Sequence, residues 1–389
     1  LHILRLNGQK VSDHELTTPR TAFRQRVLYS TYDLTDQLQV GSNALGIMLG
    51  SGWYNGQKKY WGWQQQWHGS PRAIVQIEIE LNDGSTQRIV SDDTWRAAWS
   101  PITFNCLFDG ETYDARLEQP GWDQPGFDRS AWLPVNIVPA PGGKLEPMAC
   151  DPERATERLR PVSVVEPEPG MAVYDLGRNI TGWVQLRLRN AEPGATVKLR
   201  FGEAIHPDGR LNNASNNAAL QTDQYICKGG EETWEPSFTF HGFQFVEVTG
   251  APGPIDLDLI EGRFVRTAVP QTGRFACASQ SINNIHRCTL QSLLCNLQMG
   301  VPTDDTQRPE RLGWGCDAWA CANAALYNMG MARVYQKWFG DFRDQQEDCG
   351  FVGMITPQAG PDEDLVWSAA FVIMPWWQYR YCGDKRVLD

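Results

Sequence analysis

Apolar and polar residues alternate along several stretches in the first two thirds of the chain. Residues 73–81 alternate, and the Asn-Asp-Gly sequence at 82–84 that follows them is typical of a hairpin turn. Residues 182–189 and 195–201 show the same period of two, as expected of antiparallel strands with one exposed face. The chain from residue 1 to about 267 is therefore predicted to be β structure.

Breaks in this pattern divide the β region in two. The sequence Pro-Ala-Pro-Gly-Gly at 139–143 favours a linker. We expect one β-sandwich over residues 1–139 and a second over 150–267, with an Asn-rich loop at 211–217. A length of 389 residues suits two or three domains with sizeable cores.

The period changes to that of a helix from about residue 273. Ser279 or Ser281 is available as the N-cap of a first helix. The positions that follow helical spacing are Ile282, Ile285, His286, Thr289, Leu293 and Leu297. Further helices are predicted over 317–328, 331–347 and 365–382, which makes Gly300–Trp314 a loop between helices.

This loop and the start of the next helix carry an unusual density of charge. Four carboxylates, two arginines and one tryptophan lie within residues 304–317, in an apolar neighbourhood. Because a buried, unpaired carboxylate is costly, such crowding favours a polar ligand. A carboxyl that moves protons, polar groups that bind hydroxyls and a ring that stacks on a pyranose suit a sugar site. The alternative is a solvated turn with local salt bridges.

The stretch from Pro302 to Asp317 resembles the PTDxxQRxERLGWxxD signature of bacterial α-L-rhamnosidases, glycoside hydrolase family 78. The resemblance extends along practically the whole chain. Further matching segments are 6–8, 26–29, 43–46, 52–54, 110–116, 175–183 and 201–203.

The resemblance implies a multidomain β + α fold. Residues 1–139 and 150–267 would be antiparallel β-sandwich domains, the second of them concanavalin-like. Residues 273–389 would be the first helices of an (α/α)6 barrel, incomplete here because they supply about four of its dozen helices. With partners missing, inner barrel faces are expected to be exposed at Leu326, Trp338, Phe342, Phe371 and Trp376.

The implied activity is inverting, exo-acting hydrolysis of terminal α-L-rhamnosyl residues from plant glycosides or pectic polysaccharides. Glu310 matches the family's general acid, which would protonate the glycosidic oxygen. Further residues match positions that hold the sugar: Asp304 and Asp317 with Asp305 beside them, Arg308, and the walls Trp314 and Trp367.

Each role has a structural alternative. Glu310 could anchor Arg311 through an ion pair, Asp317 could be the N-cap of the next helix, and Trp367 could belong to a core. The chain also departs from the family pattern at Pro309, at Gly315-Cys316, and at Ser368-Ala369 after Trp367.

An inverting enzyme also needs a second carboxylate, about 6.5–9.5 Å from the acid, to activate water. Asp362, Glu363 and Asp364 form the only late acidic cluster, and they do not match the family's position for this base. The base is therefore expected beyond Asp389.

A rival hypothesis is a non-catalytic carbohydrate-binding protein built on the β-sandwiches. Some relatives in the resembled family bind rhamnose through a calcium-dependent module. Residues 62–68 and 109–111 are weak candidates for such a module here.

Composition narrows the classes of partner. A net charge of −11 argues against nucleic acid and anionic membranes, and no apolar run reaches the roughly 18 residues of a membrane span. The ten cysteines lack metal-type spacing and are predicted to be buried or free thiols. We expect no cofactor, with calcium left open. Homo-oligomerisation and the choice between a cytoplasmic and an exported location also stay open.

Overall fold

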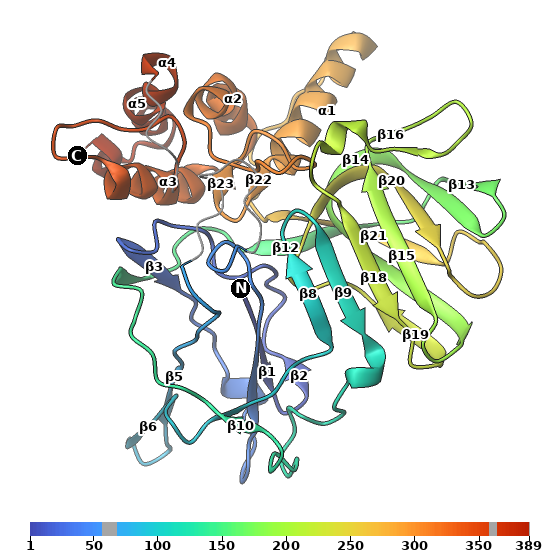
Figure 1. The fold of residues 1–389 in the computed structure, drawn as a ribbon. Coiled ribbons are helices and arrows are strands. Elements are labelled where there is room, and N and C mark those ends of the chain that lie inside the picture. The colour runs from blue at the N-terminus through green and yellow to red at the C-terminus, as the bar shows by residue number, and fades with distance from the viewer. Residues whose placement is uncertain (57–67, 358–363, 389) are drawn as a thin grey trace.

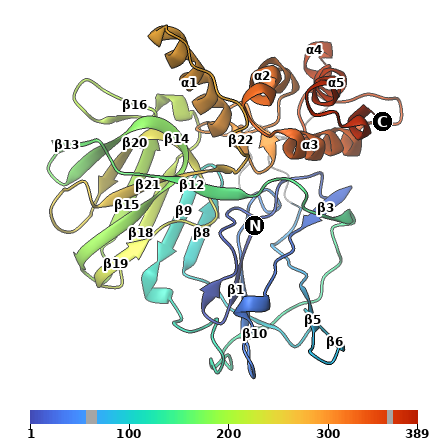
Figure 2. The ribbon, with the colours of Figure 1, turned by 180° about the vertical axis from the view of Figure 1, so that it is seen from behind.

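A computed structural model describes residues 1–56, 68–357 and 364–388 (Figure 1). The first part of the described chain is β structure, and the helices follow it in sequence. Seen from the front and from behind, the helices lie together at one end of the molecule, beyond the strands (Figures 1 and 2). No helix of the described residues is long and apolar enough to cross a membrane.

The N-terminal part consists of short strands in small sheets. β1 pairs with β2 and β4, β5 with β6, β7 with β10, and β3 runs parallel to β11. The hairpin predicted around residues 82–84 is confirmed, since β5 and β6 flank that turn. The bounds are β1 (His2–Leu6), β2 (Gln9–Lys10), β3 (Arg26–Tyr29), β4 (Leu45–Leu49), β5 (Gln76–Glu80), β6 (Thr86–Val90), β7 (Arg96–Ala97), β10 (Leu133–Pro134) and β11 (Lys144–Pro147).

A ten-stranded sheet forms the centre of the β structure, in the order β12-β21-β14-β20-β15-β18-β9-β8, with β13 and β19 also paired to β14. Its strands are β8 (Ile102–Cys106), β9 (Gly110–Asp114), β12 (Glu153–Leu159), β13 (Ser163–Glu168), β14 (Met171–Ala191), β15 (Thr196–Gly202), β18 (Thr222–Ile226), β19 (Gly230–Trp234), β20 (His241–Thr249) and β21 (Ile260–Thr267). Two smaller pairs are β16 (Ala204–Ile205) with β17 (Leu211–Asn212), and β22 (Leu297–Gln298) with β23 (Val301–Pro302).

The sheet takes strands from both sides of the linker predicted at 139–143. β8 and β9 precede that segment, and β9 joins the sheet by parallel pairing with β18. The structure thus has one large sheet to which the N-terminal part contributes two strands. The domain bounds 1–139, 150–267 and 273–389 stay predictions.

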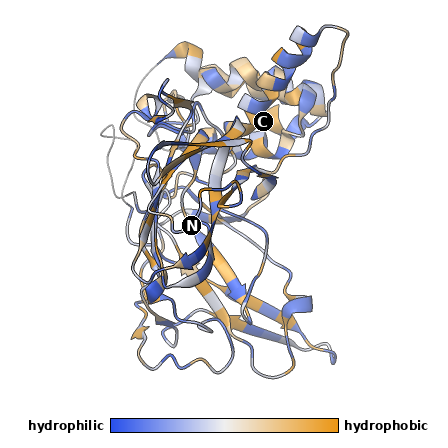
Figure 3. Ribbon diagram, turned by 90° about the vertical axis from the view of Figure 1, so that its right-hand side faces the viewer, coloured by the Kyte–Doolittle hydropathy of each residue, from blue (hydrophilic) through white to orange (hydrophobic). Residues whose placement is uncertain are grey.

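Alternation along the strands explains the core of this sheet. In β15, Val197, Leu199 and Phe201 are buried while the residues between them face outward, because successive side chains of a strand point to opposite faces. Figure 3 shows apolar and polar residues interleaved along the strands. The buried faces of β14, β15, β20 and β21 form one hydrophobic cluster.

The predicted helices are confirmed with small shifts at their ends. They are α1 (Gln280–Cys295), α2 (Gly315–Asn328), α3 (Ala332–Gln345), α4 (Leu365–Ser368) and α5 (Ala370–Cys382). Ser279 is the N-cap of α1, since its hydroxyl accepts from the backbone N–H of Ile282. The helix expected over 365–382 is divided at Ala369, and Leu297 lies in β22 rather than in α1. Short 3₁₀ helices occur at Thr35–Gln37, Ala214–Asn216, Ala115–Leu117 and Lys385–Leu388.

The expectation that Trp338 and Phe342 are exposed is wrong. Both side chains are fully buried in a second core, which α2, α3 and α5 form with the β22–β23 hairpin. Trp338 also donates its indole N–H to the carbonyl oxygen of Thr356 at 3.1 Å. Of the other residues named, Trp376 is exposed, and Leu326 and Phe371 are partly buried. All ten cysteines are free thiols, four of them buried.

A buried ion cluster fastens α3 to the N-terminal part of the chain. Arg26 on β3 donates to Asp344 at 2.6 Å and to Asp341 at 2.7 Å. Lys337 donates to the second oxygen of Asp341 at 2.7 Å. Asp341 is fully buried, and Arg26 and Lys337 are nearly so, which makes this cluster a specific contact between the two parts.

Arg26→Met is expected to lower the free energy of unfolding by about 3 kcal/mol. Removing one partner of a buried ion pair costs about 3–5 kcal/mol, and Lys337 remains to face Asp341. Urea denaturation would measure the loss. The control is Arg88→Met, which breaks an exposed pair with Glu78 and should cost less than about 1 kcal/mol. Equal losses in the two variants would contradict the role given to the cluster.

Candidate active site

The charged loop predicted between helices starts from the β22–β23 hairpin. Its turn has left-handed backbone at Met299 (φ 51°) and Gly300 (φ 67°). The carboxyl group of Glu153 accepts from the N–H of Met299 at 2.8 Å and from the hydroxyl of Thr267. Glu153 is buried, which raises its pKa to about 8. The side chain of Glu153, at the start of β12, therefore holds the turn of the β22–β23 hairpin, after which the loop begins.

Two glycines let the loop pack closely on its surroundings. A Cβ at Gly242 on β20 would overlap Thr306, and a Cβ at Gly313 would overlap the carbonyl oxygen of Thr356. On the inner side, Leu312 belongs to a third apolar cluster together with Trp53, Phe108 and other residues of the N-terminal part and the sheet. The loop thus lies between the β structure and the helices and contacts both.

Three of the predicted acids meet in this loop. Side-chain oxygens of Asp304, Asp305 and Glu310 all lie within 4.8 Å of one another. Asp304 accepts from the N–H of Leu312 at 2.9 Å, and Asp305 accepts from the Nε of Arg308 at 2.7 Å. Asp305 and Glu310 are 6% and 7% exposed. These three acids therefore form one largely buried cluster.

Burial and proximity change the protonation of this cluster. The pKa of Asp304 is raised to about 9, first by burial, then by the neighbouring charge of Asp305 and a hydrogen bond with Glu310. The pKa of Asp305 is also raised by burial, and Arg308 opposes the rise. At neutral pH the cluster consequently retains a proton, which is what a proton-donating site needs.

The two tryptophans predicted as walls of the sugar site lie on different segments, which meet at the start of α2. Trp314 precedes the first residue of α2, and Trp367 lies in α4 with its carbonyl oxygen against Gly315. Within the described residues, neither indole N–H has a hydrogen-bond partner although both are buried, and the same holds for one oxygen of Asp305. Since buried polar groups are normally satisfied, these three atoms are candidates to bind a ligand.

Asp317 does not cap α2. The helix begins at Gly315 and its N-cap position is Trp314, so Asp317 lies inside the first turn with an exposed side chain. The capping interpretation is therefore wrong. Arg308 extends partly into solvent, with 42% of its side chain exposed.

Arg311 is a residue of the site that the sequence motif did not assign to it. Its guanidinium is buried and donates to the carbonyl oxygen of Phe240 at 2.6 Å and to that of Leu107. These acceptors lie far away in sequence, so no local pattern marks them.

The residues considered for a calcium module have other partners where the structure describes them. Glu111 accepts from the backbone N–H groups of Ser237 at 3.1 Å and Phe238 at 2.9 Å, and burial raises its pKa to about 8. Asp109 accepts from the N–H of Leu220 at 3.2 Å. The other candidates, Gly62 to Trp67, lie outside the described residues, as do Asp362 and Glu363.

Family models cover nearly the whole chain. The α-L-rhamnosidase N-terminal domain matches residues 1–157, the bacterial α-L-rhamnosidase concanavalin-like domain 165–266, and the bacterial α-L-rhamnosidase six-hairpin glycosidase domain 270–389. An α-L-rhamnosidase of Streptomyces avermitilis is 40% identical over all of this chain, which covers 38% of that protein. One from Formosa agariphila is 32% identical over 99% of this chain and 42% of its own length.

Solved structures agree with this assignment. The α-L-rhamnosidase of Dictyoglomus thermophilum superposes with a TM-score of 0.95 at 40% identity, covering 100% of this chain and 43% of the other. The S. avermitilis enzyme complexed with L-rhamnose gives 0.94 at 39% identity, covering 100% and 38%. The Aspergillus terreus enzyme gives 0.93 at 32% identity, covering 100% and 46%.

The chain belongs to the bacterial α-L-rhamnosidases, as three consecutive domain models and relatives matched along its entire length show. It spans 38% to 42% of the length of the curated relatives it matches. The resemblance drawn from the signature motif is confirmed.

The raised pKa of Asp304 predicts a pH-dependent effect of Asp304→Asn. A carboxyl with a folded pKa of about 9 and an unfolded value near 3.8 stabilises the fold fully below pH 3.8 and loses that contribution as pH rises towards 9. The amide does not ionise, so the melting temperature of the variant relative to the original protein should increase between pH 5 and pH 8.

Asp83→Asn is the control, and its melting temperature relative to the original protein should not change between pH 5 and pH 8. Asp83 is exposed, and hydrogen bonds from Ser85 lower its pKa, so its contribution is lost towards acid rather than towards alkali. Thermal melts at both pH values would measure the difference. A constant offset for Asp304→Asn would show that Asp304 ionises normally.

Proposed function

We propose that the protein is an exo-acting α-L-rhamnosidase that hydrolyses terminal α-L-rhamnosyl residues of plant glycosides or pectic oligosaccharides with inversion. The observation that carries this proposal is the buried, proton-retaining cluster of Asp304, Asp305 and Glu310 in the family's signature loop. Family membership and the relative solved with L-rhamnose support the choice of sugar.

Glu310 would donate a proton to the glycosidic oxygen as the bond to the rhamnosyl carbon breaks. This role needs a carboxyl that holds its proton near neutral pH, and the cluster retains one because two adjacent buried carboxyls cannot both ionise cheaply. Asp304 then serves the reaction by sharing that proton, in addition to the hydroxyl-binding role that the family pattern implies.

The surrounding side chains would hold the sugar ring. The indole N–H groups of Trp314 and Trp367 and the free oxygen of Asp305 can bond to hydroxyls, while the apolar ring faces can contact C–H groups. Asp317 and Arg308 are partly or fully accessible and can reach a ligand from solvent. We propose these residues as the rhamnose subsite.

The water-activating base of an inverting reaction is a separate group. An inverting base stands about 6.5–9.5 Å from the acid, which is farther than the 4.8 Å that contains the oxygens of Asp304, Asp305 and Glu310. Neither Asp304 nor Asp305 has the spacing that leaves room for the water. Their contribution is therefore to the proton of Glu310 and to sugar binding.

Glu310→Gln should lower the turnover of an unactivated rhamnoside by about 10²–10⁴-fold, the usual contribution of a general acid. The loss should be smaller for p-nitrophenyl α-L-rhamnopyranoside, because nitrophenolate leaves without protonation. The measurement is steady-state kinetics of the protein expressed from its complete gene. The control is Glu146→Gln, a half-buried carboxyl of β11 that pairs with Lys144 and lies far from the loop in sequence.

Proton NMR of the released sugar would identify the stereochemistry in the same experiment. Initial release of the anomer opposite to that of the substrate is expected. Retention would instead require a nucleophile close to Glu310 and would direct attention to Asp305. A protein that binds L-rhamnose but releases none from either substrate would favour the rival hypothesis of a carbohydrate-binding protein.

A further inference from the structure

The side chain of Arg311 connects the catalytic loop to three distant points of the β structure. One guanidinium nitrogen donates to the carbonyl oxygens of Phe240 and Leu107, and the other terminal nitrogen donates to the side-chain oxygen of Gln221 at 3.3 Å. Its Nε donates to the carbonyl oxygen of Arg308 within the loop at 3.3 Å. The guanidinium therefore braces the loop internally and fastens it to the sheet.

Two aromatic rings complete the binding site of this guanidinium. Its central carbon lies 4.5 Å from the ring centre of Phe240 and 5.2 Å from that of Phe108. Such contacts are favourable for a cation, and more so when water is excluded. Arg311 is 2% exposed, so its charge is met entirely by the protein.

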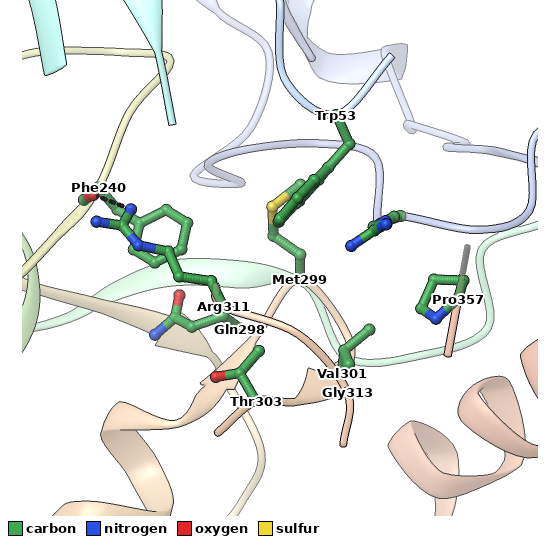
Figure 4. A pocket seen from close by; sticks show the side chains of 10 residues that line it. Trp53, Phe240, Gln298, Met299, Val301, Thr303, Arg311, Gly313 and Pro357 are labelled. Carbon is green, nitrogen blue, oxygen red and sulfur yellow. Dashed lines mark hydrogen bonds between the residues drawn. The ribbon is translucent and has the colours of Figure 1, made fainter. Parts of the chain in front are cut away.

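The space around Arg311 is closely filled. The cavity beside it, which Trp53, Gln298, Thr303 and other residues line, has a volume of about 10 Å³. Such a volume leaves room for no more than about one water molecule. In Figure 4 the Arg311 side chain extends away from Gly313 and towards the carbonyl group of Phe240.

The backbone at Arg311 also depends on these contacts. Its φ angle is 54°, a left-handed conformation that is unfavourable for a side chain of this size. Such a conformation persists only where its surroundings hold it. Because the conformation at residue 311 sets the direction in which the chain leaves Glu310, the contacts of the Arg311 side chain bear directly on the placement of the acid.

We propose that Arg311 is a positioning residue, whose guanidinium holds the loop against the β sheet so that the carboxyl of Glu310 is placed by the sheet rather than by the helices. This inference rests on the proposed function of Glu310 as the general acid. It assigns to the β structure a part in catalysis that needs no contact with the sugar.

The charge of Arg311 provides a readout that a purely structural role would not give. Burial raises the pKa of Asp305, and the positive charge of Arg311, together with that of Arg308, opposes this rise. The other carboxyls of the cluster are those of Asp304 and Glu310. Removing the charge should let the cluster hold its proton to higher pH. A lysine at the same position keeps the charge but not the fork that reaches several acceptors.

The test compares Arg311→Met, Arg311→Lys and Arg26→Met in the protein expressed from its complete gene. We expect both Arg311 variants to lower kcat on an unactivated rhamnoside by about 10–100-fold with KM within about threefold, because a small displacement of an acid costs about this much. The basic limb of the kcat/KM profile should move to higher pH in Arg311→Met and stay in place in Arg311→Lys. Arg26→Met, a buried arginine of the α3 contact, should lower only the melting temperature.

Crystal structures of the Arg311 variants provide a readout independent of activity. The carboxyl of Glu310 should be displaced from Asp304 in Arg311→Met, and Arg311→Lys serves if the methionine variant does not fold. A wild-type protein that releases no rhamnose would refute the proposed function, while a displaced Glu310 would still support the positioning role. Wild-type kcat, an unmoved pH profile and an undisplaced Glu310 in the foldable variant would overturn that role.

Discussion

An irregular loop with three acids has to be buried between a β sheet and a layer of helices, and its backbone and charges must all be satisfied there. Regular structure would pair the backbone groups, but the loop from Thr303 to Gly313 contains neither a helix nor a strand. The guanidinium of Arg311 resolves part of this problem, because it donates to the carbonyl oxygens of Leu107 and Phe240, which lie next to the ends of β8 and β20. The rest is resolved inside the loop, where Asp304 accepts from Leu312 and Asp305 from Arg308.

Burial of the acids makes the loop difficult to fold, but it also lets the loop keep a proton that a hydrolytic site can donate. Carboxyls in water ionise near pH 4, and a site that donates protons at neutral pH must resist this. Asp304 is held between backbone N–H, Asp305 and Glu310, so its proton is retained well above neutrality. Stability and catalysis are opposed at this point, since each buried carboxyl destabilises the fold as it ionises. The ion cluster of Arg26, Lys337 and Asp341 and the apolar cores on either side support the strained region from outside.

Local patterns predicted much of the structure. Alternation identified the β5–β6 hairpin and β15, and helical spacing with a Ser cap identified α1, because periodicity and capping depend on neighbours in sequence. The joining of β9 to β18 by parallel pairing was not predictable, since that register depends on contacts over more than a hundred residues. Burial of Trp338 was missed for a similar reason: its partner Thr356 lies on another segment.

In the candidate site, too, features set by local sequence were predicted and features set by distant contacts were not. The motif placed Asp304, Asp305 and Glu310 in one loop, and the structure brings them together. It could not show that Asp317 would fall inside the first turn of α2, because the start of that helix is set by the packing of Gly315 on Trp367. Nor could it show the acceptor of Arg311 at Leu107, which is 204 residues away in sequence.

Native-state hydrogen exchange would test most directly whether the β sheet holds the catalytic loop. The amide of Leu312, which donates to Asp304, can be compared with amides of β20 and of α2 at increasing, sub-denaturing concentrations of urea. If the sheet holds the loop, the exchange free energy of Leu312 should follow that of β20, and should do so still when Arg26→Met has loosened α3. Exchange of Leu312 together with the helices, in the wild type or in Arg26→Met, would contradict this account.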